Sequence, residues 1–226
     1  MNDKQRVAKH AAALVKDGMI VGLGTGSTAD YFIAELACRV KEEGIQVTTV
    51  ASSIVSLLKA QEYALPVIAI EHLTRLDLYV DGADEVTADN VLLKGQGADL
   101  VKEKIFANAC DKFIVLVDES KMVARIGARF PIPVEVMPFA WQLVKQHLDE
   151  LGGQCKLRQN SNGNGLAVSS YGSLILDVVF NQNYDNEQLN ALLNNIPGII
   201  EHGLFFQLAD VVLLAVDKEV KEILTV

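Results

Sequence analysis

Apolar residues in the first half of the chain alternate between short continuous runs and longer stretches with helical spacing. The runs are typical of buried strands, and the stretches are typical of helices. This alternation predicts an α/β fold: a Rossmann-like, mostly parallel sheet with helices on both faces. We expect strands at 19–23, 45–51, 66–70, 76–80, 91–94 and 113–117, and helices at 2–16, 28–43, 53–64 and 98–110.

The pattern changes near Phe130-Pro131-Ile132-Pro133. The apolar run at 211–216 is expected to rejoin the first sheet, because such runs are typical of strands buried on both faces. We therefore expect a main α/β domain of residues 1–129 and 206–226, into which a small α+β domain of residues 130–205 is inserted. In the small domain we expect helices at 139–151 and 185–195, and strands at 154–159, 166–169 and 173–180.

The helix expected at 98–110 has Ala98, Val101 and Ile105 on one face, which we predict to be its buried face. On this spacing Glu103 lies away from that face. The periodicity does not distinguish Glu103 from an ordinary surface carboxylate.

Composition and charge exclude several classes of protein. The chain has 226 residues, half of them apolar, and a formal charge of −9, so it is a poor general binder of nucleic acid. No apolar run reaches the roughly 18 residues of a membrane helix, and the first residues lack a secretion signal, so we expect a cytoplasmic location. The cysteines and histidines show no metal-ligand spacing, so they predict no zinc site.

Glycines follow the first expected strand, in the segment Gly24 to Thr28. Glycines at a strand-to-helix turn let the backbone approach an anion, and the first N–H groups of the helix can donate to phosphate oxygens. The alternative is a tight turn with a helix cap and no ligand. Ser27 replaces the third glycine of a dinucleotide fingerprint, which disfavours NAD. A small phosphorylated metabolite is the better candidate, bound through Thr25, Gly26, Ser27 and Thr28.

Three carboxylates crowd the end of the strand at 76–80, in Asp81-Gly82-Ala83-Asp84-Glu85. Neighbouring carboxylates raise one another's pKa, which suits general acid–base catalysis. They could equally bind Mg²⁺ or Ca²⁺, or form a solvated Asp-Gly turn. The sequence leaves these three interpretations open.

Lys94 leaves the strand at 91–94 beside Gly95, Gln96 and Gly97. An ammonium group there can stabilise a developing oxyanion; a surface lysine before a helix is the alternative. Lys121, after the strand at 113–117, is either a phosphate partner or a solvated lysine. Because ligands of parallel α/β sheets sit beyond the carboxyl ends of the strands, we expect these segments to share one site.

Motifs in a fixed order connect these segments to a known family. The run G-x-G-T-G-S-T corresponds to Gly22–Thr28, D-G-A-D-E to Asp81–Glu85, K-G-G-G-A-x-L-x-x-E-K to Lys94–Lys104, lysine after a D-x-S turn to Asp118–Lys121, F-P-[IL]-P-V-E-V to Phe130–Val136, and I-P-G-[IV] with a following G-L-F to Ile196–Phe205. Over nearly the whole chain, this order resembles type A ribose-5-phosphate isomerases. D-G-A-D-E and the lysine–glutamate segment are the most specific of these motifs.

The resemblance implies an aldose–ketose isomerase of the non-oxidative pentose phosphate pathway, without metal or cofactor. It implies that Glu103 moves a proton between C1 and C2 of open-chain ribose 5-phosphate, and that Lys94 stabilises the enediolate. Asp81 would serve ring opening and proton exchange with the sugar oxygens. Asp84 would hold hydroxyl groups or orient Lys94.

The resemblance also implies the contacts that hold the substrate. The phosphate and nearby oxygens would be held by Thr25 to Thr28 and by Lys121, with Lys4 as a further candidate. The other substrate contacts would come from Gly82, Ala83, Gly95, Gln96 and Gly97. The implied partner is a sugar phosphate, and neither nucleic acid nor a membrane is expected as a partner. The implied assembly is a homodimer or homotetramer.

The chain departs from the family pattern at two places. Gln96 replaces the middle glycine of K-G-G-G, and Ser169–Ser173 replaces T-D-N-G-N.

Two rival functions fit the sequence less well. A regulator that senses sugar phosphates would need a DNA-binding module, and the chain has no basic helix-turn-helix segment. Coenzyme A transfer on a similar sheet is disfavoured by D-G-A-D-E together with Lys94 and Glu103.

Overall fold

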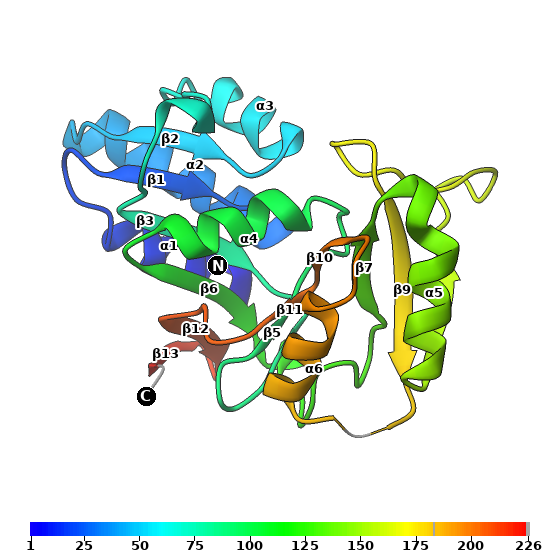
Figure 1. Cartoon of the computed structure of the whole chain (residues 1–226). Coiled ribbons are helices and arrows are strands. Elements are labelled where there is room, and N and C mark those ends of the chain that lie inside the picture. The colour runs from blue at the N-terminus through cyan, green and yellow to red at the C-terminus, as the bar shows by residue number, and fades with distance from the viewer. Residues whose placement is uncertain (183, 225–226) are drawn as a thin grey trace. The chain divides into compact units, whose positions relative to one another are not determined.

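The computed structural model describes residues 1–182 and 184–224 of the chain (Figure 1). The chain divides into two compact units. The first unit comprises Met1–Ala83, Lys102–Met122 and Gln207–Val226, and the second comprises Asp84–Val101 and Val123–Phe206. Within the described residues, no helix combines the length and the apolar character needed to cross a bilayer.

A sheet with the strand order β13-β12-β6-β3-β1-β2 forms the centre of the first unit. The strands from β12 to β2 are parallel, and β13 joins antiparallel at the edge. Because β12 pairs with β6, the apolar run near the C-terminus rejoins the first sheet, as predicted. The bounds are β1 (Ile20–Leu23), β2 (Thr48–Ala51), β3 (Leu78–Gly82), β6 (Phe113–Asp118), β12 (Val211–Val216) and β13 (Glu219–Leu224).

Helices cover both faces of this sheet, which confirms the predicted α/β fold (Figure 1). Val21 and Val80 point into a core that they share with α1 and α2. Side chains alternate along a strand, so Tyr79 points to the opposite face, where Phe106 of α4 packs edge-on against its ring. The bounds of these helices are α1 (Asp3–Ala13), α2 (Ser27–Glu43), α3 (Ile54–Glu62) and α4 (Leu100–Ala109).

An antiparallel sheet with the order β10-β7-β9-β8 forms the centre of the second unit. Its apolar side chains Val134 and Leu176 pack with Val144 of α5 and Leu193 of α6. A separate small sheet has the order β11-β5-β4. The bounds are β4 (Glu85–Val86), β5 (Leu92–Leu93), β7 (Ile132–Val136), β8 (Gly153–Leu157), β9 (Leu174–Phe180), β10 (Ile199–His202), β11 (Leu204–Phe205), α5 (Trp141–Glu150) and α6 (Asn186–Asn194).

Two predicted strands are wrong. In 66–70 only Val67 forms a bridge, to Thr49, and a short 3-10 helix (Ile70–His72) follows. In 166–169 only single bridges form, because turns on both sides leave too few residues for a ladder. Five strands, β4, β7, β10, β11 and β13, were not predicted. Of these, β13 is an edge strand whose charged residues hide its β pattern.

The two units differ from the expected domain boundaries. Asp84–Val101 and 123–129 group with the second unit. The reason is local pairing: β4 and β5 form a sheet with β11, and Val123 N donates to Val86 O at 2.9 Å. The division into domains of residues 1–129 with 206–226 and of residues 130–205 stays a prediction.

Candidate functional site

The glycine turn after β1 packs directly on β3. A Cβ atom at Gly24 would lie 2.2 Å from Asp81 Oδ1, so the approach requires glycine. Gly26 has a φ of 101°, in the region that favours glycine, and is the N-cap of α2. The first N–H groups of α2 therefore lack intrahelical acceptors beside a close turn, which is the arrangement that binds phosphate.

Two lysines of the first unit belong to the surroundings of this turn. Lys4 Nζ donates to Ser27 Oγ at 2.7 Å, so its ammonium group lies at the start of α2. Lys121 ends a short 3-10 helix (Glu119–Lys121) that follows β6. Since β6 neighbours β3 and β3 neighbours β1 in a parallel arrangement, Lys121 follows a strand end on the same sheet edge as the turn.

A cluster of buried hydroxyl groups supports the glycine turn. Thr25 Oγ1 donates to Ser53 Oγ at 2.7 Å and lies 3.0 Å from Ser52 Oγ. Ser53 also caps α3 by accepting from Ser56 N at 3.1 Å. Ser52 and Ser53 follow β2 and are buried. The sequence pattern gave no sign of this role, because serines are common in turns of every kind.

Asp81 is fully buried and holds three donors. Its Oδ1 accepts from Thr25 N at 3.0 Å and from Gly82 N at 2.7 Å. Its Oδ2 accepts from the Tyr79 hydroxyl at 2.5 Å. The carboxylate is thus fixed in one orientation at the base of the glycine turn.

Tyr79 lies near both predicted catalytic carboxylates of the first unit. Burial raises the pKa of Tyr79 well above its ordinary value, and the nearby carboxylates of Asp81 and Glu103 raise it further. The phenol therefore stays protonated and donates at any working pH. Tyr79 was missed in the sequence, although its i, i+2 spacing places it on the same face of β3 as Asp81.

Glu103 lies on the buried face of α4, contrary to the expectation from periodicity. Its exposure is 5%, whereas Ile105, predicted to be buried, is 48% exposed. Leu100 and Phe106 are fully buried on this helix. The predicted face was wrong because the buried face of α4 mixes apolar and charged residues, which a search for apolar periodicity rejects.

The Tyr79→Phe substitution tests the support of Asp81. The variant keeps the ring but leaves a buried carboxylate oxygen without its phenol donor. We expect the free energy of unfolding, measured by urea denaturation, to fall by about 1–3 kcal/mol. The matched control is Tyr171→Phe at an exposed position, which should change it by less than about 0.5 kcal/mol. Equal stability of both variants would show that the bond to Asp81 contributes nothing.

Lys94 and Asp84 lie in the second unit, on the small sheet. Asp84 N donates to Leu93 O at 2.8 Å, and Lys94 N donates to Gly203 O at 2.9 Å. Lys94 is 3% exposed, and its Nζ lies 5.6 Å from the centre of the Phe205 ring, within range of a cation–π contact. A buried ammonium group of this kind is suited to stabilise a neighbouring negative charge.

The loop after Lys94 needs glycine at one of its positions. Gly95 has a φ of 95°, and Ala98 has a φ of 64°. Gln96 is not among the residues with positive φ, so the side chain that replaces the family glycine causes no backbone strain. Its Nε2 donates to Pro131 O at 3.5 Å.

Glu85, the third carboxylate of D-G-A-D-E, has a structural role in the second unit. Its oxygens accept from the backbone N–H groups of Gly127, Arg129 and Phe130 at 2.6–2.9 Å. Among the described residues, no group of three His, Cys, Asp or Glu is arranged to hold a metal ion.

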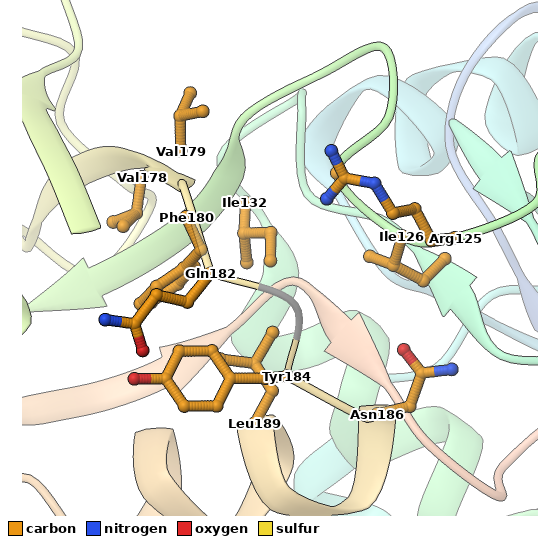
Figure 2. Close-up of a pocket in the computed structure, with 11 residues that line it drawn as sticks. Arg125, Ile126, Ile132, Val178, Val179, Phe180, Gln182, Tyr184, Asn186 and Leu189 are labelled. Carbon is orange, nitrogen blue, oxygen red and sulfur yellow. The ribbon is translucent and has the colours of Figure 1, made fainter. Parts of the chain in front are cut away.

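A cavity elsewhere in the second unit does not involve the predicted residues. Arg125, Ile132, Tyr184 and Leu189 are among the residues that line it (Figure 2). The space open to the centres of water molecules is about 30 Å³, enough for a few waters. The cavity is too small for a sugar phosphate.

The predicted site residues thus form two sets. The first unit brings together the turn Thr25–Thr28, the Asp81–Ala83 strand end and Glu103. The second unit holds Asp84, Lys94 and the loop of Gly95, Gln96 and Gly97.

Known proteins resemble this chain over nearly its full length. The model of the family "Ribose 5-phosphate isomerase A (phosphoriboisomerase A)" matches residues 48–219. The ribose-5-phosphate isomerase A of Thermosynechococcus vestitus is 42% identical over 212 residues, which are 93% of this chain and 90% of that protein.

Solved structures agree with this similarity. The ribose 5-phosphate isomerase A of Methanocaldococcus jannaschii superposes with a TM-score of 0.92 and 41% identity, over 98% of this chain and 97% of that one. A D-ribose-5-phosphate isomerase in complex with phospho-erythronic acid superposes with a TM-score of 0.94 and 37% identity. The match covers 99% of this chain and 100% of that one. The chain therefore belongs to the ribose 5-phosphate isomerase A family, the isomerases that interconvert ribose 5-phosphate and ribulose 5-phosphate.

Proposed function

We propose that Glu103 is the base of this isomerisation. It removes the C2 proton of open-chain ribose 5-phosphate, and the electron pair forms the C1–C2 double bond of an enediolate. Return of a proton to C1, with loss of the O2 proton and gain of a proton on O1, gives ribulose 5-phosphate. The observation that carries the proposal is the burial of Glu103. Its exposure is 5%, whereas the apolar Ile105 on the same helix is 48% exposed. Burial of a carboxylate at such cost is typical of a functional group.

Lys94 stabilises the negative charge that develops on the enediolate oxygens. Its ammonium group is buried and lies over an aromatic ring, so little water competes with a substrate oxygen. Asp81 exchanges protons with the sugar oxygens during ring opening, and Asp84 holds hydroxyl groups or orients Lys94. The fixed orientation of Asp81 by three donors supports this division of roles.

The phosphate binds at the start of α2. The contacts come from Thr25, Gly26, Ser27 and Thr28, and from Lys121. The position of Lys4, with Nζ 2.7 Å from Ser27 Oγ, supports Lys4 as a second cationic contact. The remaining contacts to the sugar come from Gly82, Ala83, Gly95, Gln96 and Gly97.

The ligand of one relative supports an enediolate. That isomerase was solved with phospho-erythronic acid. A sugar acid phosphate ends in a planar, anionic carboxylate, as an enediolate ends in a planar, anionic oxygen pair. The same compound is therefore a suitable competitive inhibitor for this protein.

One assay of the purified protein tests the proposed function. We expect it to isomerise ribose 5-phosphate in the presence of EDTA, and to prefer it within a panel of phosphorylated pentoses and hexoses. Preference for another sugar phosphate, or no isomerisation at all, would refute the substrate assignment.

We also propose a setting for the enzyme. It acts in the cytoplasm, in the non-oxidative pentose phosphate pathway, as a homodimer or homotetramer. The formal charge of −9 supports the absence of nucleic acid among its partners. Sedimentation analysis of the purified protein gives the oligomeric state.

A further inference from the structure

Arg158, which follows β8, lies against the loop after Lys94 in the second unit. Its Nη1 donates to Gly95 O and to Gln96 O, both at 3.0 Å. Its side chain is 12% exposed. One guanidinium group thus holds two successive carbonyl groups of the loop that the substrate is proposed to contact.

The rest of the guanidinium is held by Asp177 of β9. Arg158 Nε lies 3.1 and 3.0 Å from the two carboxylate oxygens, and Nη2 donates to Oδ1 at 2.5 Å. The backbone of Arg158 pairs as well, since its N donates to Ile175 O at 2.9 Å. Contacts to β9 therefore fix both the backbone and the guanidinium group of Arg158, whose Nη1 contacts the loop. A lysine has no planar set of N–H donors and cannot make the same contacts.

Peptide geometry gives the consequence for the loop. The C=O of one residue and the N–H of the next belong to one plane and point in opposite directions. Because Arg158 holds the carbonyls of Gly95 and Gln96, the N–H groups of Gln96 and Gly97 point away from it. A Cβ atom added at Gly97 would meet no atom within 4 Å, so open space adjoins this part of the loop.

We propose that Arg158 is a positioning residue for the isomerisation: it fixes the loop after Lys94 so that the Gln96 and Gly97 amides donate to the sugar oxygens. Two N–H donors that follow Lys94 along the chain and point away from Arg158 suit an oxygen that gains negative charge. The side chain at position 96 takes no part, which explains why glutamine can replace glycine there. The inference rests on the proposed role of Lys94.

The test compares variants of Arg158 in the full-length protein. We expect Arg158→Met to lower kcat about 30-fold and Arg158→Lys about 5-fold, with KM changed less than about threefold, because misplacement affects the transition state most. In the Lys94→Met background, Arg158→Met should lower kcat by less than about threefold more, because the positioned amides and Lys94 act on the same developing charge. The control is Lys145→Met, which breaks an i, i+4 pair on the surface of α5 and should leave kcat unchanged.

The outcomes separate this inference from the proposed function. A wild-type protein without isomerase activity refutes the proposed function. If the wild type is active, two results refute the role of Arg158. One is a wild-type kcat in Arg158→Met, and the other is a fall in kcat that is as large in the Lys94→Met background as in Arg158→Met alone. If Arg158→Met does not fold, Arg158→Lys and Asp177→Asn decide, and wild-type kcat in both refutes the inference.

Discussion

Glu103→Gln is expected to lower kcat for ribose 5-phosphate about 10³-fold, within the range that loss of a catalytic base produces. The amide keeps the size of the side chain but cannot accept the C2 proton. Binding of the substrate does not need that proton transfer, so KM should change by less than about threefold. Initial rates of ribulose 5-phosphate formation provide both constants.

A matched control separates this chemistry from a general effect of removing a carboxylate. Glu150→Gln makes the same change at an exposed position at the end of α5, and its kcat should equal that of the wild type. Full activity in Glu103→Gln would remove Glu103 as the base. Loss of activity together with loss of substrate binding would give it a binding role instead.

Lys94→Met is expected to lower kcat/KM by about 10²–10³-fold, as does removal of one donor to an oxyanion elsewhere. Methionine keeps much of the apolar stem beside Phe205 but has no charge. The proposed role is at the enediolate, which phospho-erythronic acid resembles. The affinity for this inhibitor should therefore fall by about the same factor as kcat/KM. Calorimetric titration with the inhibitor and steady-state kinetics give the two numbers.

The surface variant Lys145→Met serves as the control for loss of positive charge. It should leave kcat/KM and the affinity for phospho-erythronic acid unchanged. If Lys94→Met loses affinity for ribose 5-phosphate and for the inhibitor equally, while kcat stays at the wild-type value, Lys94 binds the substrate without stabilising the enediolate.

Local patterns predicted most of the fold. Continuous apolar runs marked β1, β3, β6 and β12, since strands buried on both faces need no polar positions. The segment 66–70 looked the same, but Pro66 removes a donor and only Val67 forms a bridge. A tight glycine turn after the first strand was also predictable, and Gly24 and Gly26 are required there by the close approach to Asp81 and by a positive φ.

Contacts between segments far apart in the chain could not be predicted. Glu103 faces the interior although its helix has no clean apolar stripe there, so periodicity gave no sign of its burial. Glu85 could not be told from Asp81 in the sequence, because only the later turn at Gly127 to Phe130 provides its N–H partners. Arg158 likewise depends on the pairing of β8 with β9.

Proton exchange with the solvent tests the central claim, that Glu103 moves the proton between C2 and C1, most directly. Ribose 5-phosphate is incubated in D₂O with EDTA and either wild-type protein or Glu103→Gln, and deuterium at C1 of ribulose 5-phosphate is followed by ¹H NMR. We predict that the wild type introduces deuterium during turnover, and that Glu103→Gln introduces it about 10³-fold more slowly. Introduction of deuterium by Glu103→Gln at the wild-type rate would contradict the account.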